Sequence, residues 1–163
     1  MLEHLFGDRS AKTVPLAIRA TRASDIQILA SLHKDGFEKA WSSTEFDVLI
    51  GDHAVLGHIA SGKDLKGMGF VLSRQAADEA EILSIVVART DRGKGVGARL
   101  LAYHLSEATR NGVRRMFLEV EAGNKAALKL YHAYGFTEQG RRKSYYRKSD
   151  GTSADALIMV RAL

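Results

Sequence analysis

The 163-residue sequence contains no cysteine, a single proline and no long run of apolar residues. Without cysteine the chain can form no disulfide, no thiolate metal site and no acyl-enzyme on sulfur. Its longest stretch without Asp, Glu, Lys or Arg is ten residues, 53–62, whereas a membrane-spanning helix needs about 20 apolar residues. Residues 1–13 mix charged with apolar side chains and have no signal-peptide core. We therefore expect a cytoplasmic protein with no membrane partner.

Composition and charge are those of an ordinary globular domain. Hydrophobic residues make up 45% and charged residues 26% of the chain, so one domain with a substantial core fits the length. The formal net charge of +5 favours anionic ligands, which include a phosphorylated cofactor as well as nucleic acid. The six histidines show no metal-ligand spacing, so we expect no metal. We also expect no direct contact with nucleic acid, and a monomer or weak dimer.

Hydrophobic periodicity divides the chain into an arm and one α/β domain. Residues 1–13 are expected to be a flexible N-terminal arm, and residues 14–163 a domain with elements in the order β-α-α-β-β-β-α-β-α-β-β. Ser24-Asp25 and Ser42 are candidate caps of the first two helices. Adjacent strands suggest an antiparallel meander in the middle of the chain, and alternating strands and helices suggest parallel pairing after it. We expect a mixed central sheet of about seven strands, flanked by about four helices. The strands are expected at 14–20, 53–61, 67–74, 80–87, 113–120, 136–142 and 154–161, and the helices at 25–36, 43–50, 98–111 and 124–134.

The strongest local signal is a glycine-rich turn between an apolar strand and a helix. It reads Arg92-Gly93-Lys94-Gly95-Val96-Gly97. Glycines let backbone amides approach an anion closely, and a helix N-terminus adds free donors and the positive end of the helix dipole. The turn lacks the Lys-Ser/Thr of a P-loop, and its last glycine falls one residue early for the dinucleotide pattern. It predicts a phosphate or pyrophosphate site; the alternative is a turn that serves only tight packing.

Three further residues downstream of this turn are candidate functional residues. In the strand 113–120, Glu119 shares a face with Phe117, opposite the apolar face of the strand, and it is either a reactive carboxylate or an ordinary surface one. Asn124 is a candidate cap of the next helix. Tyr131, seven positions further on, returns to the same side of that helix. By pattern alone it fits a packed aromatic as well as a catalytic phenol.

Together these segments resemble the GNAT superfamily of acetyl-CoA-dependent N-acetyltransferases. The resemblance covers about residues 16–163 and follows the order of the elements throughout. Residues 80–160 are similar, more narrowly, to the RimI-type ribosomal-protein-alanine N-acetyltransferases. The motifs that carry this narrower likeness are Leu118-Glu119-Val120, Asn124, Leu130-Tyr131, Gly135-Phe136, and Arg142-Lys143-Ser144-Tyr145-Tyr146 before Asp150-Gly151.

The resemblance implies a role for each motif. Main-chain amides of the turn would grip the pyrophosphate of CoA, the preceding strand would pair with the pantetheine arm, and Asn124 would contact the cofactor. Glu119 would be the general base and Tyr131 the general acid of a direct attack by an amine on acetyl-CoA, the cosubstrate. The implied cofactor-binding residues are Ile85, Val86, Val87, Arg92, Gly93, Lys94, Gly95, Val96, Gly97 and Asn124.

The acceptor implied by the resemblance is the N-terminal α-amine of a protein, and more narrowly the N-terminal alanine of a small-subunit ribosomal protein. The alternatives are a small amine or lysine side chain, and a non-catalytic acetyl-CoA-binding module. Two departures from the family pattern lie where its members recognise the acceptor. Glu121-Ala122-Gly123 stands in place of the usual Arg-x-Ser, and residues 37–42 stretch the usual Phe-Pro-Trp-Ser.

The remaining polar residues are expected to have no special role. Arg19, Arg22 and the cluster Arg141-Arg142-Lys143 are read as solvated faces, some of which could guide an anionic ribosome-associated partner. Ser84 is read as an ordinary strand position.

Overall fold

The computed structural model describes residues 14–163, so the expected arm at 1–13 lies outside the described residues. Seven strands and four helices follow one another in the order predicted from the sequence, with two short 3-10 turns added. The strands are β1 (Ala17–Ala20), β2 (Val55–Ser61), β3 (Gly67–Ala76), β4 (Glu79–Val87), β5 (Arg115–Glu121), β6 (Thr137–Arg147) and β7 (Ser153–Ala162). The helices are α1 (Ile26–Gly36), α2 (Ser43–Gly51), α3 (Val96–Arg110) and α4 (Lys125–Ala133), and the 3-10 turns are η1 (Ala23–Asp25) and η2 (Arg89–Asp91).

All seven strands form one mixed sheet in the order β1-β2-β3-β4-β5-β7-β6. The meander of β2, β3 and β4 is antiparallel, as predicted. Among the strands of residues 14–163, parallel pairing occurs between β4 and β5 only. β6 runs in the same direction as β5, but β7 is inserted between them and is antiparallel to both. The expected parallel pairing of the second half is therefore confirmed for one pair and wrong for the others.

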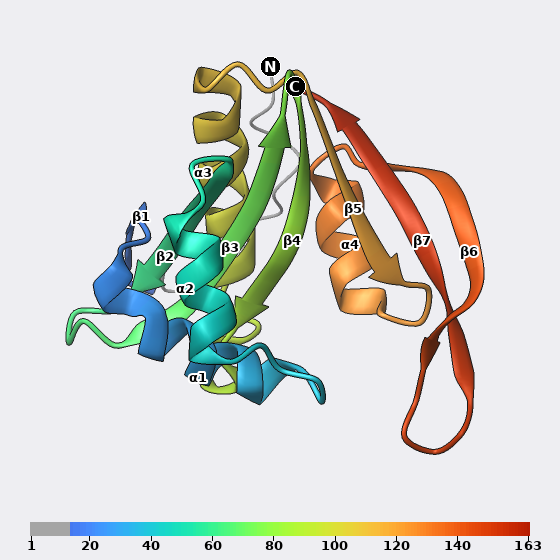
Figure 1. Cartoon of the computed structure of the whole chain (residues 1–163), viewed down its shortest axis with the longest axis horizontal. Helices are drawn as coiled ribbons and strands as arrows, with labels where there is room; N and C mark the ends of the chain where they lie inside the picture. The colour runs from blue at the N-terminus through green and yellow to red at the C-terminus, as the bar shows by residue number, and fades with distance from the viewer. Residues whose placement is uncertain (1–13) are drawn as a thin grey trace.

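Helices cover both faces of the sheet (Figure 1). α1 and α2 pack on one face, where Leu29, Phe46 and Phe70 are fully buried. α3 and α4 pack on the other, around a larger cluster that includes Leu100, Met116 and Tyr131. Among residues 14–163 no helix is long and apolar enough to cross a membrane.

The central feature of the sheet is the separation of β4 from β5. Their paired residues run only from Glu79↔Arg115 to Ile82↔Leu118, and beyond this point the two strands diverge toward their carboxyl ends (Figure 1). At the same level the register between β3 and β4 shifts, because Leu72 and Ser73 pair with Ser84 and Ile82. Leu83 is therefore an extra residue on β4. A bulge of this kind exchanges the faces of the sheet for every later residue of the strand.

The burial pattern of β4 follows this exchange. Ala80 and Ile82, before the bulge, belong to the core under α3 and α4, whereas Val86, after it, belongs to the core under α1 and α2. Ser84 is two residues before Val86 and shares its face. Its hydroxyl is buried and has no hydrogen-bond partner within residues 14–163, so the sequence reading of an ordinary strand position missed this feature.

Of the two predicted helix caps, local hydrogen bonds confirm the one at α2 and not the one at α1. Ser42 caps α2 in a reciprocal arrangement with Glu45, as expected from the sequence. Asp25, in contrast, does not cap α1 through its side chain. Its carboxylate accepts two hydrogen bonds from Arg19 at 2.8 Å and one from the amide of Arg22. The bonds from Arg19 hold the pKa of Asp25 below its usual value and outweigh the effect of burial, which raises it. The Arg19 side chain remains 40% exposed, and its guanidinium is in addition held by the buried carboxylate of Asp25.

Candidate active site

The glycine-rich turn forms an open nest at the start of α3. Gly93 and Gly95 have φ values of 73° and 78°, which only glycine adopts readily, and a Cβ at either position would meet no atom within 4 Å. Glycine is thus required there by backbone conformation and not by crowding. Gly95 is the N-cap of α3, and no side chain caps that helix. Its first amides consequently remain available to an anion.

Charged side chains line this turn. Lys94 lies 3.4 Å from the carboxylate of Asp91, and the guanidinium of Arg92 donates to the carbonyl oxygen of Val87 at 3.2 Å. Both cations are exposed and can move toward a ligand. Val96 differs from its neighbours, because its side chain is fully buried in the core. Of the predicted cofactor residues, Val96 can therefore contribute only its backbone.

Gly97 brings three elements together. A Cβ at this position would lie 3.4 Å from Cγ2 of Val87 on β4 and 3.7 Å from Cδ2 of Leu130 on α4. The turn, the end of β4 and one side of α4 therefore meet at the mouth of the gap between β4 and β5. On β4, the predicted cofactor residues Ile85, Val86 and Val87 pair with β3 along one edge. Their other edge faces the gap and has no strand partner within the described residues.

Asn124 caps α4 as one reading of the sequence predicted. Its side-chain oxygen accepts a hydrogen bond from the amide of Ala127 at 3.2 Å, and its side chain is exposed. This bond uses the side-chain oxygen only, so the amide nitrogen remains free to donate to a ligand. The proposed contact with the cofactor stays a prediction.

Glu119 is partly exposed on the face of β5 that looks toward α1 and α2. Its carboxylate lies 3.2 Å from Arg142, and the side chain is 22% exposed. Glu121, two positions further along β5 and on the same face, lies 2.8 Å from Lys148. Arg141 pairs with Asp155 at 3.0 Å. Arg141 and Arg142 are exposed, as expected, and each of them also pairs with a carboxylate.

Tyr131 approaches the gap from the opposite side. It projects from α4 into the core, is 6% exposed and packs edge-on against Phe136 at 5.8 Å between ring centroids. Burial, with a smaller contribution from Tyr146, raises the pKa of Tyr131 to about 12. The hydroxyl therefore stays protonated at any physiological pH and can donate a hydrogen bond.

Tyr146 is the site residue whose role sequence reasoning missed. It is half-buried on β6, and its pKa is raised by burial and then by the negative charges of Glu119, Tyr145 and Glu121. Its charge also contributes to the raised pKa of Tyr131 on α4, so it is coupled electrostatically to both candidate catalytic residues. Its place in the Arg-Lys-Ser-Tyr-Tyr motif was the available signal.

A cavity of about 470 Å³ opens beside these residues. One wall is the end of α1 and the following loop (Gly36, Phe37 and Glu38), the other is the β6–β7 hairpin from Tyr146 to Asp150, and Glu121 lies between them. Ser149 on the hairpin donates to Glu38 on the loop at 3.2 Å, so the two walls touch. The departures from the family pattern noted in the sequence thus lie at this cavity.

A buried histidine fixes the loop that forms the first wall. The ring of His33 is stacked between Phe37 and Trp41, with centroids 4.4 and 4.5 Å away. Its Nδ1 accepts a hydrogen bond from the amide of Trp41 at 3.0 Å, and burial lowers its pKa. The neutral ring therefore serves as packing for the loop and has no catalytic contact here.

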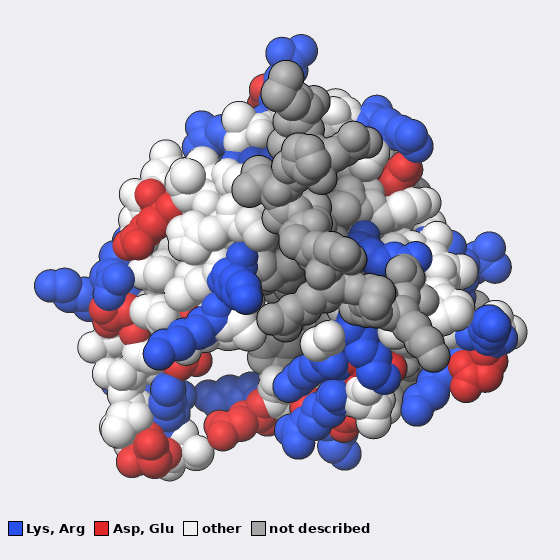
Figure 2. Space-filling view, turned by 180° about the vertical axis from the view of Figure 1, so that it is seen from behind, with Lys and Arg blue, Asp and Glu red and all other residues white. Residues whose placement is uncertain are grey.

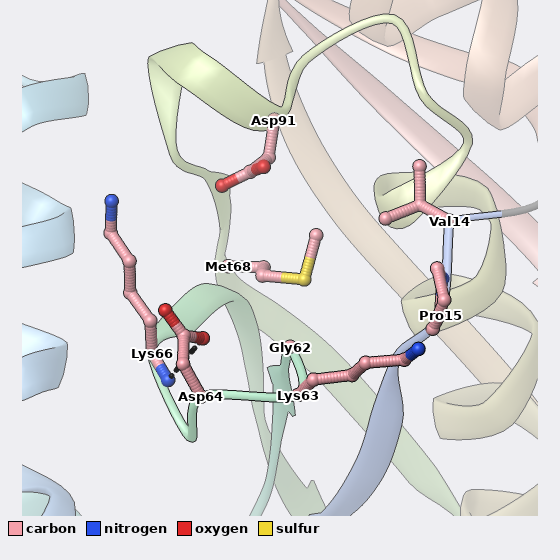
Figure 3. Close-up of a pocket in the computed structure, with 8 residues that line it drawn as sticks. All are labelled: Val14, Pro15, Gly62, Lys63, Asp64, Lys66, Met68 and Asp91. Carbon is pink, nitrogen blue, oxygen red and sulfur yellow. Dashed lines mark hydrogen bonds between the residues drawn. The ribbon is translucent and has the colours of Figure 1, made fainter.

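A second hollow of about 420 Å³ lies behind the glycine-rich turn (Figure 3). Lys63, Asp64 and Lys66 come from the β2–β3 turn, and Asp91 closes the hollow from η2. It contains none of the predicted catalytic residues. On the molecular face seen from behind, lysines and arginines are spread among uncharged residues, and acidic side chains lie next to several of them (Figure 2). Within residues 14–163 no group of three or more His, Asp or Glu side chains is placed to hold a metal.

Comparison with known proteins identifies the family of this chain. Residues 26–136 match the family model described as Acetyltransferase (GNAT) family. The chain belongs to this family. The resemblance seen in the glycine-rich turn and in the Leu-Glu-Val strand is therefore confirmed, and so is the predicted single-domain GNAT fold.

Particular GNAT proteins are similar over different lengths. The [ribosomal protein bS18]-alanine N-acetyltransferase of Escherichia coli K12 is 37% identical over 95 residues, which is 58% of this chain and 64% of that protein. The match thus spans just under two thirds of that relative. The N-alpha-acetyltransferase RimI of Mycobacterium tuberculosis is 36% identical over 157 residues, 93% of this chain and 96% of that protein. The crystal structure of the ribosomal-protein-S18-alanine N-acetyltransferase from Escherichia coli has a TM-score of 0.84 at 28% identity, and covers 91% of this chain and 94% of that one.

Proposed function

We propose that this protein transfers an acetyl group from acetyl-CoA to the N-terminal α-amine of a protein. The observation that carries the proposal is the gap between β4 and β5, with a glycine-rich turn of uncapped amides at one side and a cavity lined by carboxylates and by Tyr146 at the other. The likeness to an N-alpha-acetyltransferase over 93% of the chain supports it.

The residues around the turn fit a CoA thioester. Uncapped amides at the start of α3, together with Arg92 and Lys94, suit a pyrophosphate. The free edge of β4 at Ile85–Val87 presents backbone donors and acceptors to an amide-containing arm. When bound, acetyl-CoA supplies the activated acetyl group. The protein holds the thioester in the gap and excludes water from it.

Glu119 would act as the general base. An N-terminal α-amine has a pKa near 8 and is mostly protonated at neutral pH, so it must lose a proton before it can attack. The carboxylate of Glu119 takes that proton, the amine nitrogen bonds to the acetyl carbon, and the carbon–sulfur bond breaks to release the CoA thiolate. The second proton of the attacking nitrogen then passes to solvent, which leaves the neutral amide. The sequence contains no cysteine to form an acyl-enzyme, which favours this direct attack.

Tyr131 would assist the leaving thiolate. With a pKa of about 12, its hydroxyl is a weaker acid than a thiol, whose pKa is about 8.5. Full proton transfer from tyrosine to thiolate is therefore uphill by roughly 5 kcal/mol, at about 1.4 kcal/mol per pKa unit. We infer that Tyr131 stabilises the thiolate as a hydrogen-bond donor, and that the proton is finally supplied through solvent.

The cavity suits an extended peptide better than a small amine. It is open, lies between a loop and a hairpin, and carries both acidic and basic side chains, Glu38 and Glu121 among the former and Arg147 and Lys148 among the latter. The names of the relatives extend the proposal to the N-terminal alanine of a ribosomal protein. A cytoplasmic location agrees with such an acceptor and stays a prediction.

The experiment is acetylation of a peptide panel followed by intact-mass and fragment analysis. Peptides with free Ala, Ser or Met N-termini and one internal Lys are incubated with acetyl-CoA, and thiol release is measured in parallel. Acetyl groups are expected on the α-amine. Acetylation mainly on Lys would overturn the assignment in favour of a lysine acetyltransferase. Tight acetyl-CoA binding without any turnover would favour the non-catalytic binding module.

A further inference from the structure

Arg142 lies on β6, yet its guanidinium reaches a carboxylate on β5. Its Nη1 is 3.2 Å from Oε1 of Glu119, although β7 stands between the two strands. In the register Arg142 pairs with Ala156, which in turn pairs with Glu121. Residues paired across antiparallel strands project to the same face. Ala156 contributes only a methyl group there, which leaves room for the guanidinium to cross.

A bulge in β6 presents this arginine to the site. Between Arg142 and Tyr146, four steps along β6 match two steps along β7. Ser144 adopts a φ of 52° within the bulge, and its amide donates to Asp155 at 2.9 Å. The guanidinium of Arg142 lies 5.2 Å from the ring centroid of Tyr145. The cation is therefore held by stacking and by one carboxylate, at a position that the bulge fixes.

The ion pair is weak enough to be exchanged. The side chains of Glu119 and Arg142 are 22% and 51% exposed, and pairs of this kind contribute about 0–1 kcal/mol to stability. The neighbouring pair of Lys148 with Glu121 already balances the other carboxylate on this face. An incoming α-ammonium therefore adds an uncompensated positive charge unless one of the two cations leaves its carboxylate.

We propose that Arg142 is a positioning residue which holds the carboxylate of Glu119 in the free enzyme and yields it to the ammonium of the acceptor. This inference rests on the proposed function of Glu119 as base. One cation replaces another at the carboxylate, so the charge of the site is unchanged on binding. A proton then passes from the ammonium nitrogen to an oxygen of Glu119. Glu119 then releases that proton to solvent, and the guanidinium of Arg142 pairs with the carboxylate again.

The test compares Arg142→Gln and Arg142→Lys with wild type in steady-state acetylation of an N-terminal peptide. Arg142→Gln removes the competitor, so KM for the peptide is expected to fall by up to about 5-fold, the equivalent of 1 kcal/mol. It also removes the group that orients the carboxylate, so kcat is expected to fall by roughly 10-fold. Arg142→Lys restores the charge without the planar fork. We expect it to return KM to the wild-type value and kcat only in part.

Arg74→Gln is the matched control. Arg74 lies on β3, away from the gap. Its side chain is 48% exposed and pairs with Asp52 at 3.4 Å. Its kcat and KM should equal those of wild type, and acetyl-CoA affinity by calorimetry should be unchanged in all variants. Wild-type kinetics in Arg142→Gln, or a raised KM, would overturn the inference while leaving the proposed function intact. If wild type forms no α-acetylated product, the proposed function fails and the inference fails with it.

Discussion

The two candidate catalytic side chains have opposite environments. Glu119 is partly exposed and ion-paired, so it can exchange partners and protons with the acceptor and with solvent. Tyr131 is buried and its pKa is raised to about 12, so it keeps its proton throughout the reaction. Under the proposed mechanism, this division would place the mobile proton on the acceptor side of β5 and a fixed hydrogen-bond donor on the cofactor side.

Replacing the base should have the larger effect. Glu119→Gln keeps the shape of the side chain and removes the proton acceptor, so the acetylation rate near neutral pH is expected to fall by roughly 10²–10⁴-fold. Raising the pH should recover part of the loss, because more of the amine is then already neutral. Glu79→Gln is the control, since Glu79 is also partly exposed and paired with an arginine, at 3.3 Å. A Glu119→Gln enzyme as active as wild type at pH 7 would make this carboxylate structural.

Replacing the phenol isolates its hydroxyl. Tyr131→Phe keeps the packing against Phe136, so the melting temperature and acetyl-CoA affinity are expected to stay nearly unchanged. Turnover is expected to fall by roughly 10- to 1,000-fold through loss of the hydrogen bond to the thiolate. Tyr134→Phe on the same helix is the control. Full activity in Tyr131→Phe would show that solvent alone supports the leaving group.

Among the elements, the turn before α3 and the bulges of β4 and β6 position the site. The bulge in β4 ends the pairing with β5 and sends Val86 to the other face. The bulge in β6 carries Arg142 and Tyr146 over β7 toward Glu119. Both gap and acceptor cavity therefore depend on small local insertions within otherwise regular strands.

Substitutions of two glycines of the turn are expected to have different effects, one on cofactor affinity and the other also on stability. Gly97→Asp places a Cβ at ordinary contact distance from its neighbours and a carboxylate in the first turn of α3, which a helix tolerates. Folding should persist, whereas acetyl-CoA affinity by calorimetry should fall at least about 10-fold through charge repulsion. Gly95→Val, with φ at 78°, should in addition lose about 1–2 kcal/mol of stability.

Gly51→Asp is a suitable control for the added charge, because Gly51 is exposed at the end of α2 and has no atom within 4 Å of a Cβ. If Gly97→Asp bound acetyl-CoA as tightly as this control, the turn would not be the phosphate site.

At the scale of the whole molecule, a buried polar chain links α3 to the sheet. Nδ1 of His58 lies 2.8 Å from Nδ1 of His104, and Nε2 of His104 lies 2.7 Å from the hydroxyl of Ser73. Burial, and then the charge of His58, lowers the pKa of His104 to about 3. Burial also lowers the pKa of His58, partly opposed by Glu107.

These buried histidines predict that acid destabilises the fold. The unfolded histidines have a pKa near 6.5 and bind protons that the folded ones refuse. The contribution of these histidines to stability is therefore fully present above about pH 6.5. As the pH falls from there toward the pKa of the folded state, each histidine lowers the free energy of unfolding by up to about 1.4 kcal/mol per pH unit. Thermal unfolding between pH 7 and 5 should show this slope. His104→Gln should be less stable at pH 7 but show a smaller slope, while His132→Gln, at an exposed position, should keep the wild-type slope. Equal slopes in all three proteins would contradict the assignment.

The sequence by itself determined the order of the elements, the family and the glycine-rich turn before α3. Each depends on local information: hydrophobic period, caps such as Ser42 with Glu45, and glycines at positive φ. Such signals lie within a few residues of one another, so they can be read along the chain. Asn124 and the Leu-Glu-Val strand belong to the same class.

Only the tertiary structure decided how these parts meet. The insertion of β7 between β5 and β6, the extra residue in β4 and the pair of Arg142 with Glu119 join segments far apart in the chain. No local propensity encodes them, because each arises from strand pairing and side-chain packing across the sheet. For the same reason the sequence assigned Arg19 and Arg142 to solvent, whereas the fold gives each of them a carboxylate.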